Sequence, residues 1–371
     1  MKFFSLAGRL MLLAVVLTAM GFALWLWNRS KELTEPVLQP INQSYVGYSH
    51  VPNKALGLKL ETFQFKGWDG GAVQAVIAEK EGEESSRQLT VIGDLTVNKA
   101  DDLGRIDYVL ICVDWDHGIR SALPLAESFT AAGLKCVLWD SRGVNDRRPY
   151  CTHGLKESAD VPKLIDELER RSGEANPVIV AVGQGYGAGL MLQAAAVEPR
   201  IRGLISIDAC ASLRESIQRT LPGGALSPLT IWLMDMRMNS CVGIECFDVA
   251  PVESASRISR NIPVLVVNLV QDNPVSTMKD ALTIYRQLPC DLREVWTMAG
   301  PNDSVDATHR SVPVGRSLDG TPHLVDVGLL RDEDTAAVSM LHWLNDQFVP
   351  TLDAPLTVAP PRPELTPDSH L

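Results

Sequence analysis

The sequence predicts an α/β protein in which a mostly parallel central sheet is flanked by helices, with a small cap insertion and an N-terminal transmembrane helix. Three observations predict this class. An uncharged stretch, residues 10–27, stands near the N-terminus. Apolar strand-like runs alternate with helix-like segments from residue 108 onward, which is typical of a parallel sheet covered by helices. An irregular insertion, at about 209–250, interrupts that alternation.

The uncharged stretch is long enough to cross the hydrocarbon core of a bilayer as a helix, which rises about 1.5 Å per residue. It ends in "LWLWN", which places Trp25 and Trp27 where interfacial aromatic residues are common. A cleaved signal peptide usually has a shorter apolar core and a small-x-small cleavage site. We therefore expect an uncleaved anchor, and the membrane is the first expected partner.

The charges on the two sides of this stretch predict its orientation. Lys2, Arg9 and the terminal amine precede it, whereas Arg29 and Lys31 follow it. Because the more basic flank usually stays in the cytoplasm, we expect a single-pass protein with a cytoplasmic N-terminus and an extracytoplasmic main domain.

The composition sets the broad class of the remaining chain. With 371 residues, of which 46% are apolar and 21% charged, it can bury a full hydrophobic core. The net charge of −11 and the absence of long basic runs disfavour a phosphate-binding surface. We therefore expect no nucleic-acid partner, and a small-molecule or protein ligand is the remaining kind of partner.

The elements follow in a regular order after the anchor, residues 1–30. Residues 31–60 have no clear period and predict a linker, and residues 61–349 predict the folded domain. That domain begins with a hairpin around a turn at 68–71, and residues 87–97 are a further strand candidate. Strands are expected at 108–115, 135–140, 177–183, 203–208, 263–269 and 293–298, and helices at 121–132, 157–171, from 186 onward, at 277–288 and at 334–347. The proline-rich tail, residues 350–371, predicts disorder.

The stretch "VIVAVGQGYGAGL", residues 178–190, predicts a strand, a tight glycine turn and a helix of small residues. Together with the antiparallel start and the parallel sheet, it resembles the α/β-hydrolase fold. Three further blocks resemble the membrane-anchored serine hydrolases of the alpha/beta-hydrolase domain 13 type: the Asp-x-Arg-Gly turn at 140–143, the Gly-x-x-Glu-x-x-Asp stretch at 154–160, and the strand before Asp272. The resemblance extends from near residue 61 to near residue 349.

The resemblance implies a catalytic triad, of which this sequence keeps one position. The family has Gly-x-Ser-x-Gly at the nucleophile turn, and Gly185 stands where the serine is expected. The acid position falls on Asp272, and the histidine position falls on Asp303, or on Asn302 if the alignment shifts by one. His309 is the nearest histidine that can substitute as a base. Because glycine has no side-chain nucleophile, covalent serine catalysis at this turn is excluded.

The oxyanion region also departs from the family pattern. The family's His-Gly pair aligns with Val113 and Asp114, and an aspartate there would repel an oxyanion. With Gln184 and Tyr186, which flank Gly185, these residues are the expected ligand pocket. The resemblance therefore implies a non-catalytic relative with a binding, scaffolding or sensory role.

Three alternatives stay open from the residues. A working hydrolase of esters, thioesters or peptides can use relocated groups, with Asp272 and His309 activating water. Asp272 can equally be an ordinary helix cap. The spacing of Gly183, Gly185 and Gly189, followed by Asp208, is a weak match to a dinucleotide-binding loop.

No cofactor or metal is expected. The seven histidines include no pair at i, i+3 or i, i+4, and no Cys-x-x-Cys occurs. The stretch "DWDHG" carries Asp114, Asp116 and His117, which we interpret as a solvated turn rather than an ion site.

Overall fold

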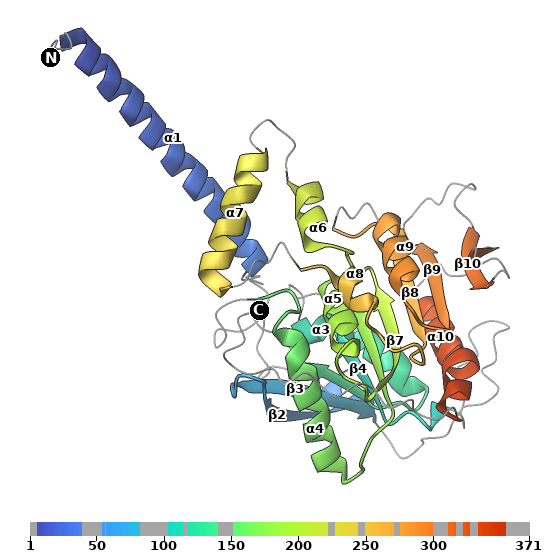
Figure 1. Ribbon diagram of the computed structural model, residues 1–371. Coiled ribbons are helices and arrows are strands. Elements are labelled where there is room, and N and C mark those ends of the chain that lie inside the picture. Colours follow the sequence, from blue (N-terminus) through green and yellow to red (C-terminus); the bar gives the residue numbers. More distant parts are fainter. Residues whose placement is uncertain are drawn as a thin grey trace.

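A mixed sheet forms the centre of the computed structural model (Figure 1). The structure describes residues 6–38, 54–55, 57–81, 103–113, 118–139, 151–221, 227–243, 249–270, 275–299, 311–316, 322–326 and 333–353. The strands of the central sheet are β1 (Lys54–Ala55), β2 (Leu58–Lys66), β3 (Ala72–Lys80), β4 (Tyr108–Cys112), β5 (Cys136–Trp139), β6 (Ile179–Gln184), β7 (Ile201–Ile207), β8 (Val264–Val270) and β9 (Arg293–Ala299).

The nine strands have the order β1-β2-β3-β5-β4-β6-β7-β8-β9. The first three pair antiparallel, β3 pairs antiparallel with β5, and every pair from β5 to β9 is parallel. This confirms the predicted hairpin and the mostly parallel sheet. The carboxyl ends of β4, β6, β7 and β8 therefore lie along one edge of the sheet, where open parallel sheets bind ligands.

The helices are α1 (Leu6–Leu38), α3 (Gly118–Ala131), α4 (Asp160–Ser172), α5 (Tyr186–Ala195), α6 (Leu213–Thr220), α7 (Ser227–Val242), α8 (Pro251–Ala255), α9 (Met278–Gln287) and α10 (Glu333–Trp343). Short helical segments occur at η2 (Glu157–Ala159), η5 (Leu344–Phe348) and η6 (Val349–Asp353). A second, two-stranded sheet consists of β10 (Ser311–Arg316) and β11 (Pro322–Asp326). The sequence did not predict this hairpin, and the strand candidate at 87–97 lies outside the described residues.

Two hydrophobic cores cover the two faces of the sheet. One core packs α4, α5, α8 and α9 on the sheet, and the other packs α3 and α10 with the turns after it. Every residue of β4 is buried, whereas buried and exposed residues alternate along much of β2. A continuous apolar run thus gives a strand covered on both faces, and an alternating run gives one covered on a single face.

The N-terminal helix extends away from the sheet domain (Figure 1). Its segment Leu10–Thr34 has a mean hydropathy of 2.2 and is long and apolar enough to cross a membrane. The helix continues to Leu38, past residue 30, where the sequence predicted the linker to begin. The reason is a tertiary contact: Ser30 and Thr34 are fully buried, and the end of α1 packs against α7.

Candidate functional site

The turn between β6 and α5 has the backbone of a nucleophile elbow. Gly185 has φ 55° and ψ −117°, and its N–H donates to the carbonyl oxygen of Ile207 at 2.8 Å. This region of φ and ψ is open to glycine and costly for residues with a Cβ. The turn lies at the carboxyl end of β6, with β4 and β7 on either side.

The flanking glycines are required by close approach. A Cβ at Gly183 would collide with the backbone of Gly187 and Ala188, and a Cβ at Gly187 would collide with the carbonyl oxygen of Cys112. The first turn of α5 is thus pressed against the end of β4. Gly183 and Gly187 are therefore required by close packing, and Gly185 is required by the conformation of its backbone.

The expected pocket residues that the structure describes gather around this turn. Val113 is buried directly after β4, which pairs with β6 so that Cys112 lies opposite Gly183. Gln184 and Tyr186 are half-buried on either side of Gly185. Asp114, Asp272, Asp303 and His309 lie outside the described residues, and so do Asn302, Asp116 and His117.

His153 lies beside the elbow, although sequence reasoning did not select it. Its ring meets the Tyr186 ring edge to face, with 5.9 Å between centroids. The side chain is buried, and its Nε2–H donates to the carbonyl oxygen of Val37, near the end of α1, at 2.9 Å. Burial lowers the pKa of His153 from 6.5 to about 4, so the ring is neutral at pH 7.

The segment that carries His153 is held by buried polar contacts. The carboxylate of Glu157 accepts hydrogen bonds from Thr152 N at 2.7 Å, Thr152 Oγ1 at 2.5 Å and Gly154 N at 2.9 Å. From α5, the amide of Gln193 donates to the carbonyl oxygen of His153 at 3.0 Å. His153 itself has φ 51°. These contacts fix the backbone in a conformation that is uncommon outside glycine.

Asp208 is a second buried polar residue at the same edge of the sheet. It follows β7 directly and has φ 56°. Its Oδ1 accepts hydrogen bonds from Leu269 N at 2.7 Å and from Asn268 Nδ2 at 3.1 Å. Sequence reasoning weighed Asp208 only as part of a dinucleotide site, although an acid directly after a buried strand was a signal for this edge. The carboxylate here joins the ends of β7 and β8.

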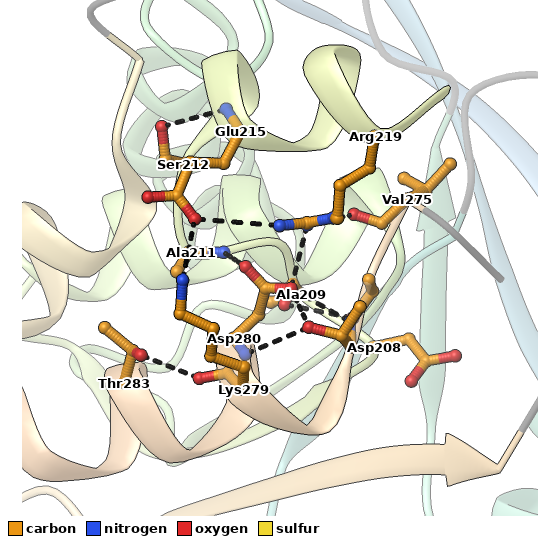
Figure 2. Close-up of polar contacts among 12 residues, drawn as sticks. Asp208, Ala209, Ala211, Ser212, Glu215, Arg219, Val275, Lys279, Asp280 and Thr283 are labelled. Atoms are coloured by element: carbon orange, nitrogen blue, oxygen red, sulfur yellow. Dashed lines mark hydrogen bonds and ion pairs between the residues drawn. The ribbon is translucent and has the colours of Figure 1, made fainter. Parts of the chain in front are cut away.

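Asp280 holds α6, the first helix of the cap insertion, on the sheet domain (Figure 2). The buried carboxylate of Asp280 accepts hydrogen bonds from Arg219 Nη2 at 2.8 Å, Ala211 N at 3.1 Å and Thr277 Oγ1 at 2.6 Å. Arg219 also donates to the carbonyl oxygen of Val275 at 3.0 Å. Thr277 and Asp280 form the capping box of α9, so one carboxylate both caps α9 and holds α6.

Within the described part of the chain, no group of three His, Cys, Asp or Glu side chains is arranged to hold an ion, and Asp114, Asp116 and His117 lie outside it. The polar residues at the carboxyl edge are instead engaged with the backbone, as Glu157 and Asp208 show. What the described residues offer is a turn with elbow geometry, an adjacent neutral imidazole and a cap.

Comparison with known proteins identifies the fold. No protein-family profile matches the chain, and no curated protein matches it in sequence. Among solved structures, an esterase of Pyrococcus furiosus is 13% identical with a TM-score of 0.50, and the match covers 83% of this chain and 96% of the esterase. The 2,6-dihydroxy-pseudo-oxynicotine hydrolase is 13% identical with a TM-score of 0.51, over 78% of this chain and 68% of that one. Similarity at this identity shows the α/β-hydrolase fold alone.

Proposed function

We propose that this protein is a membrane-anchored α/β-hydrolase-like protein that binds a ligand at its elbow without covalent serine catalysis. It would be a relative of the alpha/beta-hydrolase domain 13 type with a degenerate triad and an extracytoplasmic main domain. One observation carries the proposal: Gly185 has the elbow backbone but no side-chain atom that can attack a carbonyl.

The nearest described histidine does not replace the lost chemistry. A general base works best when its pKa lies near the working pH, and burial holds the pKa of His153 at about 4. Its Nε2–H is also engaged with Val37. His153 therefore positions Tyr186 and the end of α1, and we assign it no role in proton transfer.

Buried hydrogen bonds around the elbow support a binding role. Buried carboxylates at Glu157 and Asp208 hold the His153 segment and the ends of β7 and β8 in fixed positions. The Asp280 contact holds α6 on the same domain. Such preorganisation serves recognition as well as catalysis. Val113, Asp114, Gln184 and Tyr186 are the residues that we propose to line the pocket.

The first test is labelling with a fluorophosphonate probe, followed by intact mass measurement and peptide mapping. The full-length protein in detergent should acquire no adduct. Gly185→Ser combined with Asp303→His, which restores both positions that the family resemblance implies, should acquire one adduct on the new serine. Gly185→Ser alone is the matched control for the contribution of the histidine.

Two outcomes would change the conclusion. An adduct on the unmodified protein would place a nucleophile elsewhere and favour a hydrolase with a relocated nucleophile. A hydrolase in which Asp272 and His309 activate water would form no adduct, so ester turnover tests it, and Asp272→Ala and His309→Ala should then each abolish that turnover. Turnover of an ester panel by the unmodified protein, lost on mutation of pocket residues, would also contradict a purely binding role.

A further inference from the structure

Helix α7 presents an apolar stripe that the folded domain leaves uncovered. Outside α1, the large hydrophobic side chains that are exposed in the described residues are Leu229, Trp232, Met236 and Val275. Three of these four lie on α7, at spacings that place them on one face of the helix. Trp232 is 55% exposed. A cluster of this kind on a folded domain usually marks an interaction surface.

The exposed face of α7 changes character along the helix. Leu229, Trp232 and Met236 follow one another from near its N-terminus to just past its middle, and Asn239 and Ser240 continue the same exposed face toward the C-terminus. The opposite face carries Met234 and Met238, which are buried in a cluster with α6. The helix is therefore polar at one end of its exposed face and apolar at the other.

The direction of α7 relative to α1 shows where the apolar end lies. Both helices end at the His153 segment: Val37 at the end of α1 accepts the His153 hydrogen bond, and Val242 at the end of α7 accepts one from Lys156 Nζ at 3.4 Å. Farther from the domain, the Arg237 guanidinium lies over the Trp27 ring, 5.2 Å from its centroid. The two helices thus both approach the same segment of the domain, and they cross each other near the end of α1 (Figure 1).

The apolar part of α7 therefore lies farther from the His153 segment than its polar end does. Trp232 precedes Arg237 by five positions, which is about 7 Å of helix. Trp25, which precedes Trp27 by two positions, is also exposed. Burial within α1 begins at Leu26 and recurs at Ser30 and Thr34, so the helix pair starts where the apolar run of α1 ends.

We infer that the N-terminal part of α7 rests in the interfacial layer of the lipid bilayer, with Leu229, Trp232 and Met236 inserted beside the point where α1 leaves it. Trp at such a position is typical of membrane interfaces, and an exposed apolar stripe is stabilised when it leaves water. The stripe lies on the helix that packs against α1 where its apolar run ends, and this proximity to the expected anchor favours lipid over a second protein. The inference rests on the proposed anchoring by α1.

In this arrangement α7, the second helix of the cap insertion, connects the elbow region to the bilayer. It does so because α1 and α7 both contact the segment that carries His153. The carboxyl edge of the sheet would then face the membrane rather than bulk solvent. Ligands that partition into the interfacial layer, which are amphiphiles, would be the first to reach it.

The test is photo-crosslinking in the full-length protein, reconstituted into phosphatidylcholine vesicles. p-Benzoylphenylalanine replaces Trp232, Asn239 or Leu17 in separate variants, and intact mass measurement detects a covalently added phospholipid. Leu17, exposed in the middle of α1, reports on anchoring, and Asn239 is the matched position on α7. All three side chains are exposed, so each replacement should leave the domain folded. Circular dichroism of each variant checks this.

We expect lipid adducts at positions 17 and 232, with at least about fivefold less at 239, because the polar end of the stripe lies outside the interfacial layer. Lipid at 17 without excess lipid at 232 would overturn the docking of α7 while leaving the anchor intact. A crosslinked dimer at 232 would assign the stripe to a second copy of the chain and overturn the inference. Absence of lipid at 17 would overturn both the anchor and the docking.

Discussion

At Gly185 the backbone has φ 55° and ψ −117°, a combination that residues with a Cβ adopt only at a cost. In a serine hydrolase such a residue would hold its side chain in a strained turn for the sake of chemistry. Here glycine adopts the same turn without that strain. The backbone of an elbow therefore persists at a position that has no nucleophile, because the turn is also fixed by Gly183 and Gly187 on either side.

We predict different costs for replacing the central and the outer glycine. Gly185→Ala should lower the free energy of unfolding by about 1–3 kcal/mol, because the new Cβ must adopt this backbone. Gly187→Ala should lower it by at least about 3 kcal/mol, because its Cβ would meet the carbonyl oxygen of Cys112, which cannot move aside as a flexible side chain can. Urea denaturation followed by circular dichroism measures both.

The matched control for these two variants is Gly173→Ala. Gly173 follows α4 with φ 73°, and an added Cβ has nothing within 4 Å, so this variant shows the backbone cost without a collision. Because Gly187 lies within α5, a Gly187→Ala protein as stable as the unmodified one would mean that the close approach between α5 and β4 is absent.

The buried His153 predicts a loss of stability in acid. Its pKa in the folded protein, about 4, lies below its ordinary value of 6.5, so the unfolded chain takes up a proton first as the pH falls. The stability contribution of the neutral ring is present above 6.5 and is lost progressively toward 4, by up to about 3 kcal/mol. Urea denaturation between about pH 7 and about pH 4.5 should show this loss.

His153→Asn isolates the contribution of the imidazole. Asparagine tolerates the positive φ of this position and does not titrate, so the variant should lose less stability over the same pH range. If both proteins lose the same amount, other groups account for the acid sensitivity, and the proposed burial of the His153 ring is wrong.

At the scale of elements, helix α6 is held on the domain by a contact that one substitution, at Asp280, removes. Asp280→Ala should lower the free energy of unfolding by about 3 kcal/mol, because it leaves the Arg219 charge and the Ala211 N–H without their buried acceptor. Hydrogen exchange should also become faster in α6, residues 213–220.

A neighbouring carboxylate supplies the control for the α6 contact. Glu215 lies 3.7 Å from Arg219 Nη1, but its side chain is 51% exposed, and exposed pairs contribute little. Glu215→Ala should therefore change stability by no more than about 0.5 kcal/mol. A loss as large as that of Asp280→Ala would show that the exposed pair, and not the buried carboxylate, holds α6.

At the scale of the whole molecule, the charges around α1 predict the side of the membrane on which the domain lies. Lys2 and Arg9 outweigh Arg29 and Lys31 only through the terminal amine, so we expect an extracytoplasmic domain whose orientation a small change can reverse. A C-terminal tag should be digested by protease added to intact cells. Lys2→Glu with Arg9→Glu should protect part of the tag, whereas Arg29→Gln with Lys31→Gln should leave it fully digested.

Much of the fold was predictable because its signals are local. The parallel strands β4 to β9 are apolar runs bounded by turns, the β2–β3 hairpin shows alternation around a glycine turn, and the elbow shows three glycines after a strand. The β10–β11 hairpin gave no comparable signal. The elbow backbone at Gly185 was predictable. The pocket at Val113, Gln184 and Tyr186 stays a prediction, and so do the acid and histidine positions, which lie outside the described residues.

The sequence by itself determined the order of the strands and helices outside the insertion at about 209–250 and the β10–β11 hairpin, the apolar N-terminal helix and the absence of a serine at the elbow, since each depends on residues close together in the chain. Only the tertiary structure decided which distant groups meet. His153 and Val37 are 116 positions apart, and Asn268 and Asp208 are 60 apart. Likewise, α1 continues to Leu38 because α7 buries its last turns. Such contacts depend on how packed elements are placed, and no local pattern of residues encodes that placement.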